Sequence, residues 1–146
     1  MTLTNLVGRS LEQIEPDSAV IMRLLTAAER NITDARITQI STENRFDAAY
    51  KAIMQLANAA LQANGYRTLT STPGHHRTMI QLLGKTAGID SNTMIVLDAL
   101  RKQRNVADYS GDIVPESAMK ECIDQAEGLL IKVKDWLSKN RADLLE

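Results

Sequence analysis

A short polar run in the last third of the chain carries the residues best suited to chemistry. It reads Arg104-Asn105-Val106-Ala107-Asp108-Tyr109 and is followed by Ser110-Gly111. An arginine can bind a phosphate through two N–H groups, and Arg104 and Asp108 lie side by side if the segment is helical. The run could therefore bind an anion. Alternatively, it only ends a helix, with basic side chains that favour the helix dipole and a turn at Gly111.

Two residues outside this run are further binding candidates. Arg101 precedes Arg104 by one helical turn, so both can face one ligand. His75 and His76 are neighbours, and neighbouring side chains on a helix point about 100° apart. At most one of them, taken here as His76, faces that site, and capping or packing is its other possible role. The ligand-binding candidates are Arg101, Arg104, Asn105, Asp108, Tyr109 and His76.

No metal or cofactor site is predicted. The adjacent histidines and the single cysteine, Cys122, lack suitably spaced carboxylates that would complete a zinc site. The Gly84-Lys85-Thr86 segment lacks the earlier glycine of a phosphate-binding loop. We therefore expect any activity to need neither a metal nor a cofactor.

Composition limits the class of protein. The chain has 146 residues, with 17 Lys and Arg against 18 Asp and Glu. This balance gives no net field that would draw the protein to DNA, so RNA contacts would have to come from a local patch. A lone cysteine is typical of a reducing cytosol, and neither a signal peptide nor a membrane span is recognisable. We expect a cytoplasmic protein that contacts no DNA and no membrane.

Apolar side chains recur at spacings of three and four residues, which predicts helices. The clearest seams are Ile21, Leu25, Ala28, Ile32 and Ala35; Phe46, Ala49, Tyr50, Ile53, Ala57, Ala60 and Leu61; and Met119, Ile123, Ala126, Leu130, Val133 and Leu137. Further helices are expected over residues 2–13, over residues 76–87, and from an Asp90 cap to Gly111. Residues 66–74 are predicted to form a loop, and residues 139–146 a polar tail that frays.

These elements predict an all-α fold. Runs of β-branched residues are scarce, and short connections place consecutive helices antiparallel. We therefore expect an up-down antiparallel bundle of four to five main helices. The length suits one domain over residues 1–146, with its core at about residues 17–138.

Three segments together resemble the HEPN family (higher eukaryotes and prokaryotes nucleotide-binding). Residues 104–111 resemble the family's signature near its last helix, residues 45–52 are similar to its second long helix, and Gly74-His75-His76 resembles its short third helix. The resemblance covers about residues 17–137. It implies a HEPN-like bundle that forms a homodimer, with the Arg-Asn segments near the two-fold axis. It also implies a nucleotidyltransferase as a possible partner.

The resemblance implies ribonuclease activity where the family's Arg-x4-His pattern is complete. In this chain Arg104 and Asn105 match the pattern, but Tyr109 occupies the histidine position. A tyrosine with its usual pKa near ~10 is a poor general base at neutral pH. We therefore expect a catalytically silent HEPN subunit of a toxin–antitoxin or defence-like module. It would bind a nucleotide, RNA or a nucleotidyltransferase partner.

Two alternatives remain open. The protein could be a metal-independent endoribonuclease toxin that uses Arg104, Asn105 and Tyr109. In that case His75 or His76 could supply the missing base across a dimer interface. The protein could instead be a structural or scaffolding bundle, because a fold alone does not define a function.

Overall fold

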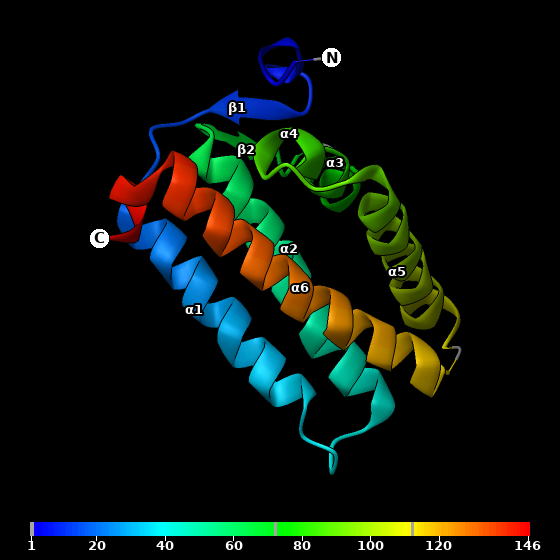
Figure 1. Ribbon diagram of the computed structural model, residues 1–146. Helices are drawn as coiled ribbons and strands as arrows, with labels where there is room; N and C mark the ends of the chain where they lie inside the picture. Colours follow the sequence, from blue (N-terminus) through cyan, green and yellow to red (C-terminus); the bar gives the residue numbers. More distant parts are fainter. Residues whose placement is uncertain (1, 72, 112) are drawn as a thin grey trace.

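The computed structural model describes residues 2–71, 73–111 and 113–146, and it is mostly helical (72%). The described residues form six packed α-helices and a small two-stranded sheet (Figure 1). In chain order the elements are η1 (Thr4–Leu6), β1 (Leu11–Gln13), α1 (Ser18–Ala35), α2 (Thr42–Ala63), β2 (Tyr66–Thr68), α3 (His75–Gln81), α4 (Leu83–Thr86), α5 (Ser91–Ser110), α6 (Glu116–Asn140) and η2 (Ala142–Leu145).

Side-chain caps begin three of the four long helices, and the cap predicted at Asp90 and the stop predicted at Gly111 are confirmed. The side chains of Asp17, Ser41 and Asp90 accept hydrogen bonds from exposed backbone N–H groups at the starts of α1, α2 and α5. Helix α5 ends where Gly111 adopts a left-handed conformation, with φ 71°, that glycine reaches without steric cost.

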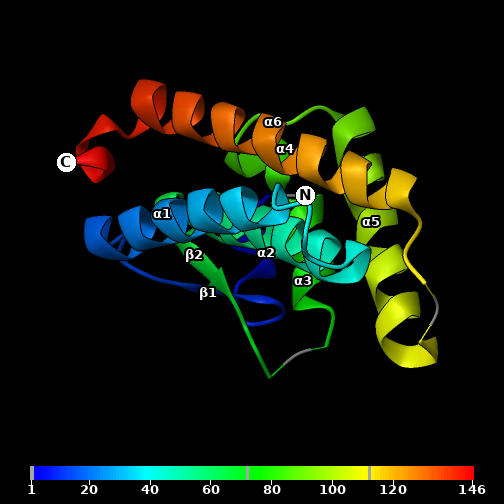
Figure 2. The same cartoon turned by 90° about the horizontal axis from the view of Figure 1, so that it is seen from below.

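Helices α1 and α2 lie antiparallel and side by side, and α6 packs across one face of this pair (Figures 1 and 2). The apolar seams predicted for α1 and α2 are buried along their whole length. The many alanines of α2 let its neighbours approach closely, since the distance between helix axes depends on the side chains at the contact. Because α2 packs closely against both α1 and α6, it lies at the centre of the bundle.

The seam predicted for α6 is confirmed except at one position. Leu129, which is 2% exposed, lies in the core, whereas Leu130 is only half-buried. Spacing along one helix cannot decide between the two residues. Their burial depends on how far the neighbouring helices extend over each side of the seam.

The N-terminal segment does not form the predicted helix, and the fold is not purely α-helical. Strand β1 pairs antiparallel with β2, with Leu11 opposite Thr68. Strand β2 lies inside the segment predicted as a loop, residues 66–74, of which Thr72 is outside the described residues. The pairing joins segments far apart in the sequence, so the local pattern of either segment could not reveal it.

The helix predicted over residues 76–87 and the tail over residues 139–146 also differ from expectation. The helix over residues 76–87 is interrupted at Leu82, which separates α3 from α4. The tail packs onto the fold, because Leu144 is buried and the single hydroxyl hydrogen of Ser18 is donated to the backbone oxygens of Leu144 and Glu146, each 3.0 Å from Ser18 Oγ. A buried leucine thus anchors a tail whose overall composition is polar.

Helix α5 is the least buried of the long helices. Only Leu97 and Leu100 are buried, and residues 101–110 contribute no buried side chain. In Figure 1 α5 flanks the other long helices and is the most separate of them. Among the described residues, no helix combines the length and the apolar character needed to cross a membrane.

Candidate functional site

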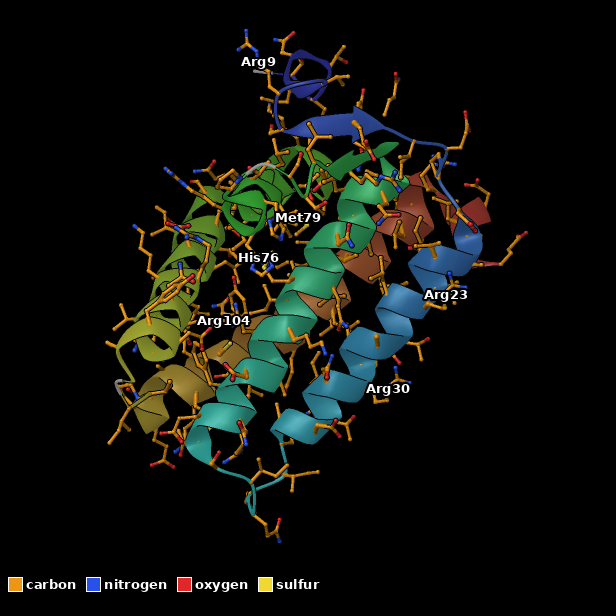
Figure 3. The ribbon with its side chains drawn as sticks, turned by 180° about the vertical axis from the view of Figure 1, so that it is seen from behind. Arg9, Arg23, Arg30, His76, Met79 and Arg104 are labelled. Carbon is orange, nitrogen blue, oxygen red and sulfur yellow. The ribbon has the colours of Figure 1, made fainter. Side chains whose placement is uncertain are left out.

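A cleft of about 580 Å³ opens between α2, α3 and α5. Figure 3 shows His76, Met79 and Arg104 in the space between α5 and α2. The lining residues are Asp47, Tyr50, Lys51, Met54, Gln55 and Asn58 of α2; Thr68 of β2 and Thr70 after it; His75, His76 and Met79 of α3; and Arg104 of α5. The cleft therefore combines cations, amides, an aromatic ring and two methionines.

Arg104 is held in place from two sides. Its guanidinium carbon lies 5.0 Å from the centre of the Tyr50 ring, a distance typical of a cation–π contact. Its Nε lies 3.7 Å from Asp108 Oδ2, one helical turn further along α5. The Arg104 side chain keeps 34% of its surface exposed, so it remains accessible from the cleft.

His76 is joined to the same tyrosine. Its Nδ1 lies 3.2 Å from the Tyr50 hydroxyl, and the ring of His75 stands edge-on at 4.7 Å between ring centres. Burial lowers the pKa of His76 below its usual value, and electrostatic interactions with His75, Arg104 and Arg101 lower this pKa further. His76 is therefore neutral near pH 7, with a ring that can accept a proton.

Tyr50 stays protonated at neutral pH. Burial raises its pKa to about 12, although nearby Arg104 and Arg101 act in the opposite direction. Tyr50 therefore acts as a neutral phenol that positions its neighbours. Its ring supports Arg104 and its hydroxyl shares a hydrogen bond with His76.

The α2 wall of the cleft is rich in hydrogen-bond donors. The Oε1 atom of Gln55 accepts a hydrogen bond of 2.8 Å from Asn31, and the Oδ1 atom of Asn58 accepts one of 3.0 Å from Gln62. The amide NH₂ groups of Gln55 and Asn58 thus remain available as donors. Lys51, which is exposed, makes no ion pair with any described acidic residue.

Among the described residues, Asp47 is the one carboxylate that lines the cleft. Burial raises its pKa, and the negative charge of Asp108 raises this pKa further, while Arg104 lowers it. The remaining charged groups of the lining are cations or histidines. An anionic ligand is therefore favoured over a cationic one.

The structure brings two of the predicted binding residues into one cleft. Arg104 and His76 both line it, from different helices of the same chain. Asp108 does not line the cleft but contacts Arg104 from α5.

The other three candidates lie outside the cleft. The Nε atom of Arg101 lies 2.9 Å from Asp98 Oδ1 in an ion pair within α5. Asn105 is half-buried and is not among the lining residues. Tyr109 is 90% exposed near the end of α5 and does not line the cleft either.

Sequence reasoning missed the contribution of α2. The sequence pattern places Tyr50 in the apolar seam, where it is indeed buried, and the structure adds that its hydroxyl reaches into the cleft. A signal was present, because Asp47, Lys51, Gln55 and Asn58 recur at spacings of three and four residues and so form one polar stripe. That pattern alone does not distinguish a cleft wall from an ordinary solvated surface.

The fold and the cleft together define a mostly helical bundle with a cation-rich cleft beside its central helix. No family model matches this chain, and no curated protein matches it in sequence. Within the described parts of the chain, no group of three His, Cys, Asp or Glu side chains is placed to hold a metal ion.

Proposed function

We propose that this protein is a HEPN-like subunit that binds a nucleotide or RNA in the cleft between α2, α3 and α5, without cleaving it. The observation that carries this proposal is the placement of Arg104 over Tyr50, beside His76 and Lys51, in one accessible cleft. A guanidinium held in this way can bind a phosphate through two hydrogen bonds.

The rest of the lining suits the other parts of a nucleotide. Met54 and Met79 offer apolar surface to a base, and the free amide donors of Gln55 and Asn58 suit sugar or base oxygens. The antiparallel arrangement of α1 with α2, with α6 packed across one face of the pair, supports a HEPN-like bundle (Figures 1 and 2).

The position of Tyr109 supports a binding site without catalytic activity. Attack by an RNA 2′-hydroxyl needs a base within hydrogen-bonding reach of that hydroxyl. Tyr109 is exposed outside the cleft, and Tyr50, which does line it, has a pKa of about 12 and so holds its proton. Neither tyrosine suits the role of general base at neutral pH.

A metal-independent endoribonuclease is the second candidate, and one observation favours it. His76 lines the same cleft as Arg104, and its lowered pKa keeps the ring neutral near pH 7. In this reading His76, rather than Tyr109, would accept the proton of the 2′-hydroxyl while Arg104 binds the phosphate. The two candidates therefore share Arg104 and differ in the role of His76.

We further propose that the protein forms a homodimer through α5 and meets a nucleotidyltransferase partner in a toxin–antitoxin or defence-like module. The outer half of α5 has no fully buried side chain; only Ala107 packs partly against the core, and Val106 and Tyr109 are exposed. Such exposed apolar side chains beside a basic motif suit a protein partner. The single buried thiol of Cys122 supports a cytoplasmic location.

The first test combines cleavage and binding in metal-free buffer. The purified protein is incubated with a labelled mixed-sequence RNA, and its affinity for fluorescent nucleotides is measured in parallel. We expect no cleavage, together with binding that Arg104→Ala weakens about tenfold or more, since a hydrogen bond to a charged group contributes about 1.5–3 kcal/mol. Arg9→Ala, which removes an exposed arginine outside the cleft, should change nothing.

The other outcomes select among the candidates. Cleavage that disappears in both Arg104→Ala and His76→Ala would establish the endoribonuclease and contradict the silent subunit. A protein that binds no nucleotide or RNA, and whose oligomeric state and partners do not depend on Arg104, would instead be a scaffold.

A further inference from the structure

We propose that the ligand of the cleft is a single-stranded polynucleotide, which continues from the cleft across α2 to a second basic groove on α1. This inference rests on the proposed function, because it takes the cleft as the site of one nucleotide. It adds the class of ligand and the path of the strand over the surface.

The path lies on the face of the α1–α2 pair that α6 leaves uncovered. Helix α6 packs against the opposite face, as the view from below shows (Figure 2). Seen from behind, α1 and α2 are in front of α6; His76 and Arg104 lie on one side of α2, and Arg23 and Arg30 lie along α1 on the other side of α2 (Figure 3). The cleft and α1 are thus reached from the same side of the molecule.

The second groove is shallow and basic. It has a volume of about 550 Å³ and is lined by Val20, Met22, Arg23, Leu24, Thr26, Ala27 and Arg30 of α1. Arg23 and Arg30 are two helical turns apart, so they point to the same side, about 10 Å from each other along the axis. Both are exposed, and neither forms an ion pair with an acid in the described part of the chain.

A polar bridge connects the cleft with α1, about 100° around the helix from Arg30. Gln55 lines the cleft, and its Oε1 accepts a 2.8 Å hydrogen bond from Nδ2 of Asn31, which follows Arg30 on α1. Packed helix axes are about 8–10 Å apart, so a few nucleotides are enough to pass from Lys51 on α2 to Arg30. The bridge exposes amides rather than carboxylates along that path.

The charges and surfaces favour a polynucleotide over a single nucleotide. Arg104 and Lys51 supply positive charge at one end of the path, and Arg23 and Arg30 supply it at the other. Repeated phosphates match cations spread in this way, whereas a mononucleotide can reach only the first pair. The apolar side chains of Val20, Leu24 and Ala27 give unstacked bases a surface to contact beside the arginines.

The test varies two things separately: the length of the ligand and the position of the cations that are removed. The affinities of a labelled 2′-O-methyl uridine mononucleotide and of a 2′-O-methyl oligouridylate of about eight nucleotides are measured; neither ligand has a free 2′-hydroxyl to be attacked. The variant is Arg23→Gln with Arg30→Gln. The matched control is Arg9→Gln with Lys85→Gln, which removes two exposed cations that line neither groove. Equal melting temperatures ensure that all proteins are folded.

We expect the wild type to bind the oligonucleotide at least about tenfold more tightly than the mononucleotide. The Arg23/Arg30 variant should lose about tenfold in oligonucleotide affinity and nothing in mononucleotide affinity. The slope of log affinity against log salt concentration should fall by about 1.4, since each phosphate contact on a single strand contributes about 0.7. The control variant should match the wild type.

The failures are distinguishable. Mononucleotide binding that needs Arg104, without any gain from length or any effect of Arg23 and Arg30, would overturn this inference and leave the proposed function standing. If neither ligand binds, both proposals are wrong. A loss of affinity of equal size in the control variant would show a general charge effect and would also overturn the path.

Discussion

Tyr50 links Arg104 to His76 inside the cleft. The Tyr50 ring lies 5.0 Å from the guanidinium carbon of Arg104, and the Tyr50 hydroxyl holds His76 at 3.2 Å, so one side chain orients two polar groups from different helices. The ring carries the cation–π contact and the hydroxyl carries the hydrogen bond. The two contributions can therefore be separated by substitution.

Tyr50→Phe should keep most of the nucleotide affinity, whereas Tyr50→Leu should lose about three- to tenfold. Phenylalanine retains the aromatic face beneath Arg104, and a cation–π contact contributes about 0.5–1 kcal/mol or more when it is partly desolvated. The measurement is a binding titration with a fluorescent nucleotide, with thermal melts to correct for stability at this buried position. Equal losses in both variants would show that the hydroxyl, and not the ring, positions Arg104.

The environment of His76 predicts that the stability of the protein falls when the pH is lowered. Burial, as the largest cause, lowers its pKa below the usual value of 6.5, so the unfolded chain binds this proton more readily than the folded protein does. The stability linked to neutral His76 is fully present above about pH 6.5. It is lost as the pH falls through the lower pKa of the folded state.

His76→Gln should therefore reduce the loss of stability between pH 8 and pH 5. Urea unfolding at both pH values measures the free energy of unfolding of wild type and variant, and the difference between the two proteins should shift in favour of the variant at pH 5. A difference that is the same at both pH values would mean that His76 titrates alike in the folded and unfolded chains.

At the scale of elements, α6 and α5 behave differently. Helix α6 buries one side against the α1–α2 pair along most of its length, while α5 buries only Leu97 and Leu100. Stability should therefore depend strongly on α6, whereas the outer half of α5 is free for contacts outside the core.

Two neighbouring leucines of α6 give a sharp test of its buried side. Leu129→Asp should cost more than about 3 kcal/mol and unfold the protein, because it places a charge at a fully buried site. Leu130→Asp, at a half-buried site, should cost roughly 1–2 kcal/mol and leave the protein folded at 25 °C. Circular dichroism melts of both variants measure the difference, and the reverse order would mean that the side of α6 facing the core is assigned wrongly.

At the scale of the whole molecule, the parts that local chemistry determines could be predicted, and the parts that long-range packing determines could not. The caps at Asp17, Ser41 and Asp90 and the periodic seams lie within single segments, so the sequence alone located the long helices. The pairing of β1 with β2, and the contribution of Tyr50 to the cleft, depend on segments brought together only by folding.

The same distinction between local chemistry and long-range packing applies to the candidate site. Arg104 and His76 were recognisable as polar candidates from their types and neighbours. That they share a cleft, while Tyr109 is exposed outside it, follows from the packing of α3 and α5 against α2, which spacing cannot give.

The proposed homodimer is testable through the face of α5 that points away from the cleft. Val106 lies two residues after Arg104, so on a helix it points about 200° away from it, and Tyr109 shares the side of Val106. Val106 is 48% exposed and Tyr109 90% exposed. We expect the wild type to sediment as a dimer and Val106→Glu with Tyr109→Glu to sediment as a monomer, because two charges would be placed in the interface.

The control is Ile131→Glu, which adds a charge at an apolar residue of α6 that is 69% exposed, a value between those of Val106 and Tyr109, and should leave the dimer intact. The nucleotide affinity of the monomeric variant then decides how the dimer and the cleft are related. Because the interface and Arg104 lie on opposite sides of α5, affinity should be unchanged and each copy should bind alone. A monomer that no longer binds would mean that the partner copy completes the cleft, and a wild type that is already a monomer would contradict the dimer itself.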